Sequence, residues 1–94
     1  MYYTYVLVSE KDKKFYTGST GDLRKRFKEH NSGYNFSTKS RRPFKLIYYE
    51  ACVDQEDAEA REKYLKSGKG KKYLRQRLKR FLLGTGYAPV TGAP

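Results

Sequence analysis

The sequence predicts a small α+β fold in which a three-stranded mixed sheet is flanked by three helices, in the order ββαβαα. Three observations lead to this prediction. Apolar segments rich in β-branched and aromatic side chains are typical of strands. Segments with apolar residues three and four positions apart, bounded by capping residues, are typical of helices. The chain has 94 residues, which is the length of one domain.

The three strands are predicted from their residue types. Tyr2–Ser9 alternates aromatic, β-branched and apolar residues, and Lys14–Gly18 follows after a polar turn. A symmetric hairpin about that turn would place Tyr5 directly opposite Tyr16 on one face of the sheet. Phe44–Ala51 is apolar enough to form a third strand that is largely covered.

The three helices are predicted from their capping residues and apolar positions. Asp22 favours the beginning of the first helix, and Gly33 suits the left-handed position that ends it. Asp54 caps the second helix, which we expect to end near Lys66, before a Ser-Gly-Lys-Gly break. The third helix is expected over Lys71–Leu83.

Composition excludes several classes of protein. The single cysteine, Cys52, rules out a disulfide framework and a four-thiolate metal site within one chain. No run approaches the roughly 18 apolar residues of a membrane span, and the polar start does not resemble a signal peptide. We therefore expect a cytoplasmic protein with no membrane partner. Residues 1–83 are expected to form the domain and residues 84–94 a flexible tail.

The positive charge is concentrated in one segment. Residues 61–80 carry ten basic side chains against Glu62 alone, and so contribute +9 of the net charge of +11. Such a segment attracts polyanions, because phosphates neutralised by lysine and arginine release their counterions. DNA or RNA is therefore the expected partner. A solvated helix face, an acidic protein and an anionic membrane surface are the alternatives. The side chains expected to hold the nucleic-acid backbone are Lys39, Arg41, Arg42, Lys66, Lys69, Lys71, Lys72 and Arg75.

Glu62 does not fit a purely structural helix. Its neighbours four positions before and three after, Ala58 and Leu65, are apolar, so its carboxylate faces the body of the domain. An unpaired carboxylate is costly to bury. Two explanations are open, a salt bridge to a lysine or arginine, or a bound cation. A hard divalent ion held by one carboxylate, waters and a phosphate is the usual pattern for magnesium.

A second cluster joins the first helix to the hairpin. Arg26 and His30 are four positions apart, so both project from one side of their helix. Beside Tyr5 and Tyr16 they would provide a permanently charged phosphate ligand and a titratable group. A tyrosine works as a base only if nearby positive charge or a metal lowers its pKa. In the alternative, Arg26 is exposed, His30 lies at the edge of the core and the tyrosines only pack.

These residues, taken in order, resemble the GIY-YIG nuclease family, and most of all its small single-domain bacterial members, which are related to the nuclease domain of the excision-repair incision subunit. The resemblance covers residues 2 to about 83. It rests on Tyr3-Thr4-Tyr5, Tyr16-Thr17-Gly18, Asp22-Leu23-x-x-Arg26, His30-Asn31, and Ala58-x-x-x-Glu62-x-x-Leu65-Lys66.

The resemblance implies a magnesium-dependent endonuclease, with manganese as a substitute, that hydrolyses DNA phosphodiesters in a structure-directed or non-specific way. It implies a metal ligand at Glu62 and catalytic roles for Tyr5, Tyr16, Arg26 and His30. We expect a monomer or a weak homodimer. A non-catalytic DNA- or RNA-binding module that retains the fold is the alternative.

The sequence departs from the family pattern at a few positions. Tyr3-Thr4 replaces Gly-Ile in the first half of the motif, and Thr17 replaces Ile in the second. Ser19 stands where repair-type members carry a lysine, which removes one candidate for activating the nucleophile. The chemistry would then depend more on the two tyrosines and His30.

Overall fold

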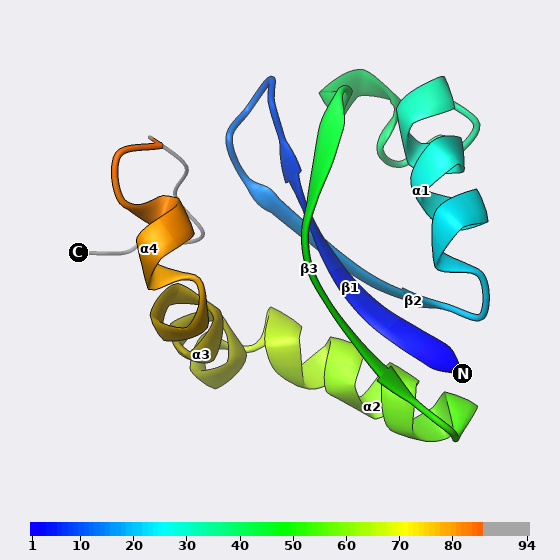
Figure 1. Ribbon diagram of the computed structural model, residues 1–94. Helices are drawn as coiled ribbons and strands as arrows, with labels where there is room; N and C mark the ends of the chain where they lie inside the picture. Colours follow the sequence, from blue (N-terminus) through cyan, green and yellow to red (C-terminus); the bar gives the residue numbers. More distant parts are fainter. Residues whose placement is uncertain (86–94) are drawn as a thin grey trace.

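The computed structural model of the chain describes residues 1–85 (Figure 1). The elements are strands β1 (Tyr2–Ser9), β2 (Phe15–Thr20) and β3 (Phe44–Cys52), helices α1 (Leu23–Ser32), α2 (Gln55–Lys66), α3 (Gly68–Arg77) and α4 (Lys79–Leu82), and the 3-10 turn η1 (Lys39–Arg41). The α+β class and the order of its elements are confirmed. Except for its first two residues, the expected tail at residues 84–94 lies outside the described residues.

The sheet has the order β2-β1-β3, with β1 in the centre. Both β2 and β3 run antiparallel to β1. The prediction of a mixed sheet was therefore wrong. The two strands that run in the same direction lie on opposite edges and never pair.

The hairpin register differs from the predicted one by two residues. Tyr5 lies opposite Gly18, and Leu7 lies opposite Tyr16. The turn is wider than a symmetric hairpin about residues 10 and 11 would need, because Lys13 adopts a left-handed φ of 64°. Since side chains alternate with a period of two, a two-residue shift keeps Tyr5 and Tyr16 on the same face.

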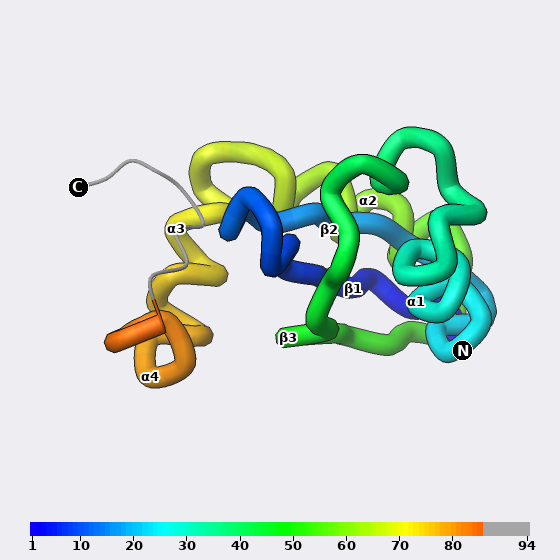
Figure 2. The backbone as a smooth tube through the Cα atoms, turned by 90° about the horizontal axis from the view of Figure 1, so that it is seen from above, coloured from blue at the N-terminus to red at the C-terminus, as the bar shows by residue number. Residues whose placement is uncertain are grey.

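Helices cover the sheet on both faces, with α1 on one side and α2 and α3 on the other (Figures 1 and 2). On the α1 side, Leu23 and Phe27 pack against a core of Tyr5, Leu7 and Phe44. On the other side, the core consists of Val6, Leu65 and Leu74. The alternating apolar residues of β1 thus serve two separate cores. Within the described residues, no helix is long and apolar enough to cross a membrane.

The predicted caps of the first two helices are confirmed. The Asp22 carboxylate accepts a hydrogen bond from the Lys25 backbone amide, and the Asp54 carboxylate accepts one from that of Glu56. Gly33 ends α1 with a φ of 84°. These caps fix where α1 and α2 begin, and so the side of the domain on which their polar residues emerge.

The third helix was predicted incorrectly at both ends. Ser67 caps α3 through its hydroxyl, which accepts a hydrogen bond from the Gly70 amide, and the helix already begins at Gly68. It ends at Arg77, and α4 follows after Leu78. Gly70 does not break a helix but lies inside α3. A Cβ at this position would lie 2.0 Å from the Tyr64 carbonyl oxygen, so only glycine fits here. Its role is the close approach of α3 to α2.

Candidate active site

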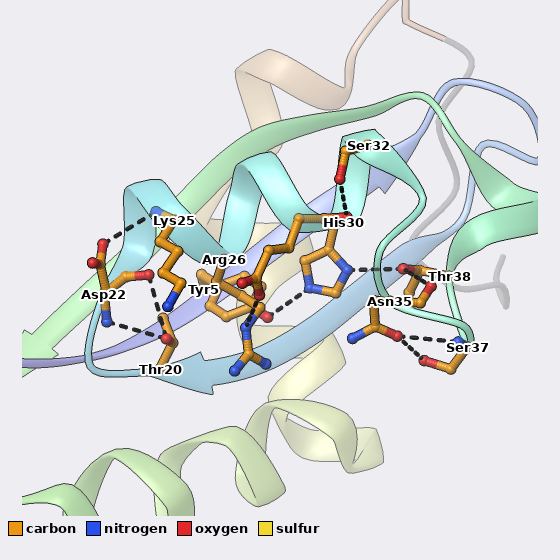
Figure 3. A network of polar contacts seen from close by, with 11 residues as sticks. Tyr5, Thr20, Asp22, Lys25, Arg26, His30, Ser32, Asn35, Ser37 and Thr38 are labelled. Atoms are coloured by element: carbon orange, nitrogen blue, oxygen red, sulfur yellow. Dashed lines mark hydrogen bonds and ion pairs between the residues drawn. The ribbon is translucent and has the colours of Figure 1, made fainter.

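Tyr5, His30 and Thr38 form a buried chain of hydrogen bonds on the α1 side of the sheet (Figure 3). The Tyr5 hydroxyl lies 2.8 Å from His30 Nε2, and His30 Nδ1 lies 2.8 Å from Thr38 Oγ1. The exposed fraction of each of these residues is 1% or less. Thr38 donates its own proton to the Asn35 carbonyl oxygen. We infer that His30 Nδ1–H donates to Thr38, and that the Tyr5 hydroxyl donates to His30 Nε2.

Burial keeps both rings of this chain neutral. It raises the pKa of Tyr5 well above its usual value, the neighbouring Tyr16 acts in the same direction, and Arg26 opposes both. Burial also lowers the pKa of His30, and the positive charge of Arg26 lowers it further. Tyr5 therefore holds its proton in this state, which does not favour a role as a base.

Tyr16, unlike Tyr5, has an available hydroxyl. Its ring packs edge-on against that of His30, with 5.0 Å between the ring centroids. The side chain is half-buried. Among residues 1–85, its hydroxyl has no hydrogen-bond partner. The Tyr16 hydroxyl can therefore bind a water molecule or a substrate oxygen.

Gly18 provides the space for Tyr5. A Cβ at Gly18 would lie 2.5 Å from the Tyr5 hydroxyl oxygen and 2.7 Å from the ring carbon that carries it. The family motif includes this glycine, but its contact with Tyr5 follows only from the observed register. Any side chain at position 18 would displace the Tyr5 ring from His30.

Glu62 comes from α2, on the other side of the sheet. Its Oε1 accepts a hydrogen bond from the Ser19 hydroxyl at 2.7 Å, and its Oε2 pairs with Lys66 Nζ at 2.8 Å. Of the two explanations left open by the sequence, the salt bridge is present. The Lys66 side chain is 54% exposed, so its ammonium group can leave the carboxylate at little cost. Ser19 orients the Glu62 carboxylate. The sequence had indicated only that this serine replaces a lysine, and not that it contacts Glu62.

The donor set at Glu62 fits a hard cation with an incomplete protein shell. In the described part of the chain, no group of three or more histidine, cysteine, aspartate or glutamate side chains could hold a metal ion by itself. A single carboxylate suits magnesium, which keeps several waters and takes other oxygens from a phosphate. It does not suit zinc, which takes three or four protein ligands.

Arg26 extends from α1 across β2, and its guanidinium points toward α2 (Figure 3). Its Nε forms an ion pair with Glu29 at 3.2 Å. A cavity of about 190 Å³ lies between the β2–α1 turn and α2, and its lining includes Arg26 and Ser19. Because β2 is an edge strand, residues from both faces of the sheet meet around it. Arg26 and Ser19 therefore share one cleft, and the Ser19 hydroxyl that lines it donates to the Glu62 carboxylate.

The structure separates the predicted DNA-binding residues into two groups. One group lies on α2 and α3 and comprises Lys66, Lys69, Lys71, Lys72 and Arg75. The other lies in the segment between α1 and β3 and comprises Lys39, Arg41 and Arg42. Within it, the Arg41 guanidinium binds Asp12 and the Lys14 carbonyl oxygen, so it is committed to the β1–β2 turn.

The basic segment at residues 61–80 is not a single free surface. Arg61 forms three hydrogen bonds with the Glu50 carboxylate and lies over the ring of Tyr73. Burial alone would raise the pKa of Glu50, but the hydrogen bonds from Arg61 and Tyr48 outweigh it and lower the pKa. Arg61 therefore joins β3 to α2 and α3, and the cations available to a polyanion begin further along the chain.

Comparisons with known proteins agree with this geometry. The family model for the GIY-YIG catalytic domain matches residues 1–75. The chain is 43% identical over 67 residues to the UPF0213 protein CPE1444 of Clostridium perfringens, covering 70% of this chain and 71% of the relative. It is 38% identical over 77 residues to a UPF0213 protein of Pediococcus acidilactici, covering 79% of this chain and 78% of the relative.

A third relative is the UPF0213 protein YazA of Bacillus subtilis, which is 41% identical over 63 residues, covering 66% of this chain and 64% of the relative. No solved structure matches the chain. The matched catalytic domain is that of nucleases that act on DNA. The motif residues, the antiparallel sheet and the family match together show that this chain belongs to the GIY-YIG family.

Proposed function

We propose that this protein is a magnesium-dependent endonuclease that cuts DNA phosphodiester bonds without reading their base sequence. The observation that carries this proposal is the arrangement around the β2 edge. There, Tyr16 on β2, Arg26 on α1 and Glu62 on α2 all lie close enough to the buried Tyr5 hydroxyl to affect its pKa. Such a site contacts phosphate rather than base edges, so it carries no sequence information.

Each residue has a role that its surroundings support. Tyr16 Oη would hold the attacking water and act as the general base that takes its proton. The Tyr5–His30 pair fixes the floor on which the Tyr16 ring rests. Arg26 stabilises negative charge on the phosphate oxygens, a contribution that reaches several kcal/mol at comparable sites.

Glu62 would hold the magnesium ion, with Ser19 orienting its carboxylate. When bound, the ion would neutralise charge on a phosphate oxygen. For the ion to bind, Lys66 must release the Glu62 carboxylate. A DNA phosphate offers the Lys66 ammonium group an alternative partner. The cations of α3 would then hold the backbone of the same DNA.

The Tyr16→Phe variant tests the role of the free hydroxyl, because it removes one oxygen and keeps the ring. Supercoiled plasmid is incubated with magnesium and either the wild type, Tyr16→Phe, or the control Tyr34→Phe, whose tyrosine is exposed in the segment before β3. We expect Tyr16→Phe to nick at least about a hundredfold more slowly, as for other general bases. If Tyr16→Phe nicks plasmid as fast as Tyr34→Phe, the Tyr16 hydroxyl has no role in the reaction.

The second candidate function is a nucleic-acid-binding module without catalysis. The specific observation in its favour is the ion pair between Lys66 and Glu62, which satisfies the carboxylate without a metal. This alternative predicts binding that weakens steeply with salt, does not need magnesium and leaves plasmid, branched and single-stranded DNA uncut.

A further inference from the structure

An exposed aromatic ring lies beside a positively charged groove in the segment between α1 and β3. The Phe36 side chain is 91% exposed, although phenylalanine is usually buried. It lines a groove of about 850 Å³ together with three cationic side chains, Lys11, Lys39 and Arg42. Among the residues that the structure describes, no carboxylate lines this groove. Within residues 1–85, none of the three cations takes part in a salt bridge.

The Phe36 ring is presented by a closed turn. Asn35 Oδ1 accepts hydrogen bonds from the Ser37 amide at 3.1 Å and from the Ser37 hydroxyl at 2.7 Å (Figure 3). The Thr38 amide donates to the Asn35 carbonyl oxygen at 3.2 Å. Phe36 lies between these residues, so little backbone entropy is lost when its ring binds a ligand.

The same turn is connected to the candidate active site. Thr38, two residues after Phe36, accepts the hydrogen bond from His30 that orients the Tyr5–His30 pair. A ligand on Phe36 is thus held by the loop that positions the floor of the site.

We propose that the groove formed by Lys11, Phe36, Lys39 and Arg42 binds a single-stranded segment of the DNA substrate. An unpaired base stacks on the Phe36 ring, and the cations contact the flanking phosphates. A free aromatic face beside cationic side chains is the arrangement by which proteins bind single strands. Bases within a duplex are already stacked on their neighbours, so they do not bind such a face. This inference rests on the proposed function and narrows its substrate to DNA with unpaired nucleotides near the cut.

The test compares variants that change the ring but not the fold. Binding of fluorescein-labelled oligothymidylate and of a duplex of equal length is followed by fluorescence anisotropy in EDTA, so that no cutting occurs. We expect Phe36→Leu to weaken single-strand binding about 5- to 150-fold, the range for losing one base–aromatic stack. Duplex binding should change less than about twofold, and Phe36→Trp should bind the single strand at least as well as the wild type.

Two further variants separate stacking from other effects. Val53→Ala removes a side chain that is 83% exposed outside the groove lining, and it should leave binding of both DNAs unchanged. Lys39→Ala should reduce the slope of log affinity against log salt by about 0.7 on the single strand, as expected for one lost phosphate contact. Unchanged single-strand binding by Phe36→Leu, or an equal loss on duplex, would overturn the inference.

Failure of this inference is distinguishable from failure of the proposed function. Wild-type nicking with no effect of Phe36→Leu on binding would leave a nuclease whose groove has no role in single-strand recognition. Phe36-dependent binding in a protein that nicks no DNA would support the groove and leave the nuclease proposal wrong.

Discussion

Replacing Thr38 with valine should destabilise the protein and change the state of its only histidine. Valine has nearly the shape of threonine but cannot accept a hydrogen bond, so His30 Nδ1–H would lose the one acceptor that it has among residues 1–85, in a fully buried position. A buried donor left without a partner costs about 1–3 kcal/mol. Loss of the long bond from Thr38 to Asn35, at 3.4 Å, contributes less.

Urea unfolding followed by circular dichroism measures this loss. With a denaturant dependence of about 1–3 kcal/mol per molar for a small protein, a loss of about 2 kcal/mol lowers the midpoint by about 1 M. A double-mutant cycle with His30→Phe isolates the interaction. In that background Thr38→Val should cost less than about 0.5 kcal/mol, because no imidazole donor remains.

Nitrogen NMR of the imidazole tests the same hydrogen bond directly, since His30 is the only histidine of the chain. The wild type should show the Nδ1–H tautomer, and Thr38→Val should increase the Nε2–H population. A wild-type Nε2–H tautomer, or a Thr38→Val protein as stable as the wild type, would refute this account of the buried chain.

Three further predictions follow from individual contacts. Gly18→Ala should cost about 1–3 kcal/mol, because its Cβ would collide with Tyr5, whereas Gly68→Ala, with nothing within 4 Å, should be neutral or stabilise α3 by up to about 1 kcal/mol in urea unfolding. The folded-state pKa of His30 lies below 6.5. Its contribution to the free energy of unfolding is therefore complete above pH 6.5 and is lost as the pH falls through the folded-state pKa. Urea midpoints that do not change with pH in this range would contradict this prediction. The hydrogen bond from Arg41 lowers the pKa of Asp12 from 3.8 to about 2. The contribution of Asp12 to the free energy of unfolding is therefore present above pH 3.8 and is lost as the pH falls to about 2. After discounting for exposure this contribution amounts to about 1 kcal/mol, and the same pH series with Arg41→Gln should lack it.

The fold was largely predictable because its signals are local. Residue types marked the strands, and Asp22 and Asp54 marked where two helices begin. The hairpin register was not predictable, because it depends on the left-handed conformation of Lys13, a residue type with no preference for that region. The beginning of α3 was missed because Gly70, a helix breaker by intrinsic propensity, is needed for contact with the α2 backbone.

The candidate site was predictable only in part. The sequence indicated several candidate functional residues. Arg26 and His30 stand out by their spacing of four positions, and Glu62 by its apolar neighbours. Their supporting partners had no signal of their own. Ser19 meets Glu62 across 43 positions, and Thr38 meets His30 through an irregular loop. Hydroxyl groups such as these are frequent in any sequence, and only the folded chain shows which of them orient a functional side chain.

Glu62 is the residue on which the proposed magnesium-dependent cutting of DNA depends. Glu62→Gln keeps an oxygen for the Ser19 hydroxyl and removes the charge, and its lost ion pair with Lys66 is exposed enough to cost little stability. Glu56→Gln is the matched control, because Glu56 is an exposed carboxylate in the first turn of the same helix.

The measurement that tests this claim most directly is the rate of plasmid nicking by equal amounts of the folded wild type, Glu62→Gln and Glu56→Gln, with magnesium and with EDTA. We predict that the wild type and Glu56→Gln nick supercoiled plasmid with magnesium, that EDTA stops both, and that Glu62→Gln is slower by at least about a hundredfold, as expected when several kcal/mol of metal assistance are lost. Nicking by Glu62→Gln at the wild-type rate, or a folded wild type that cuts no form of DNA, would contradict the account.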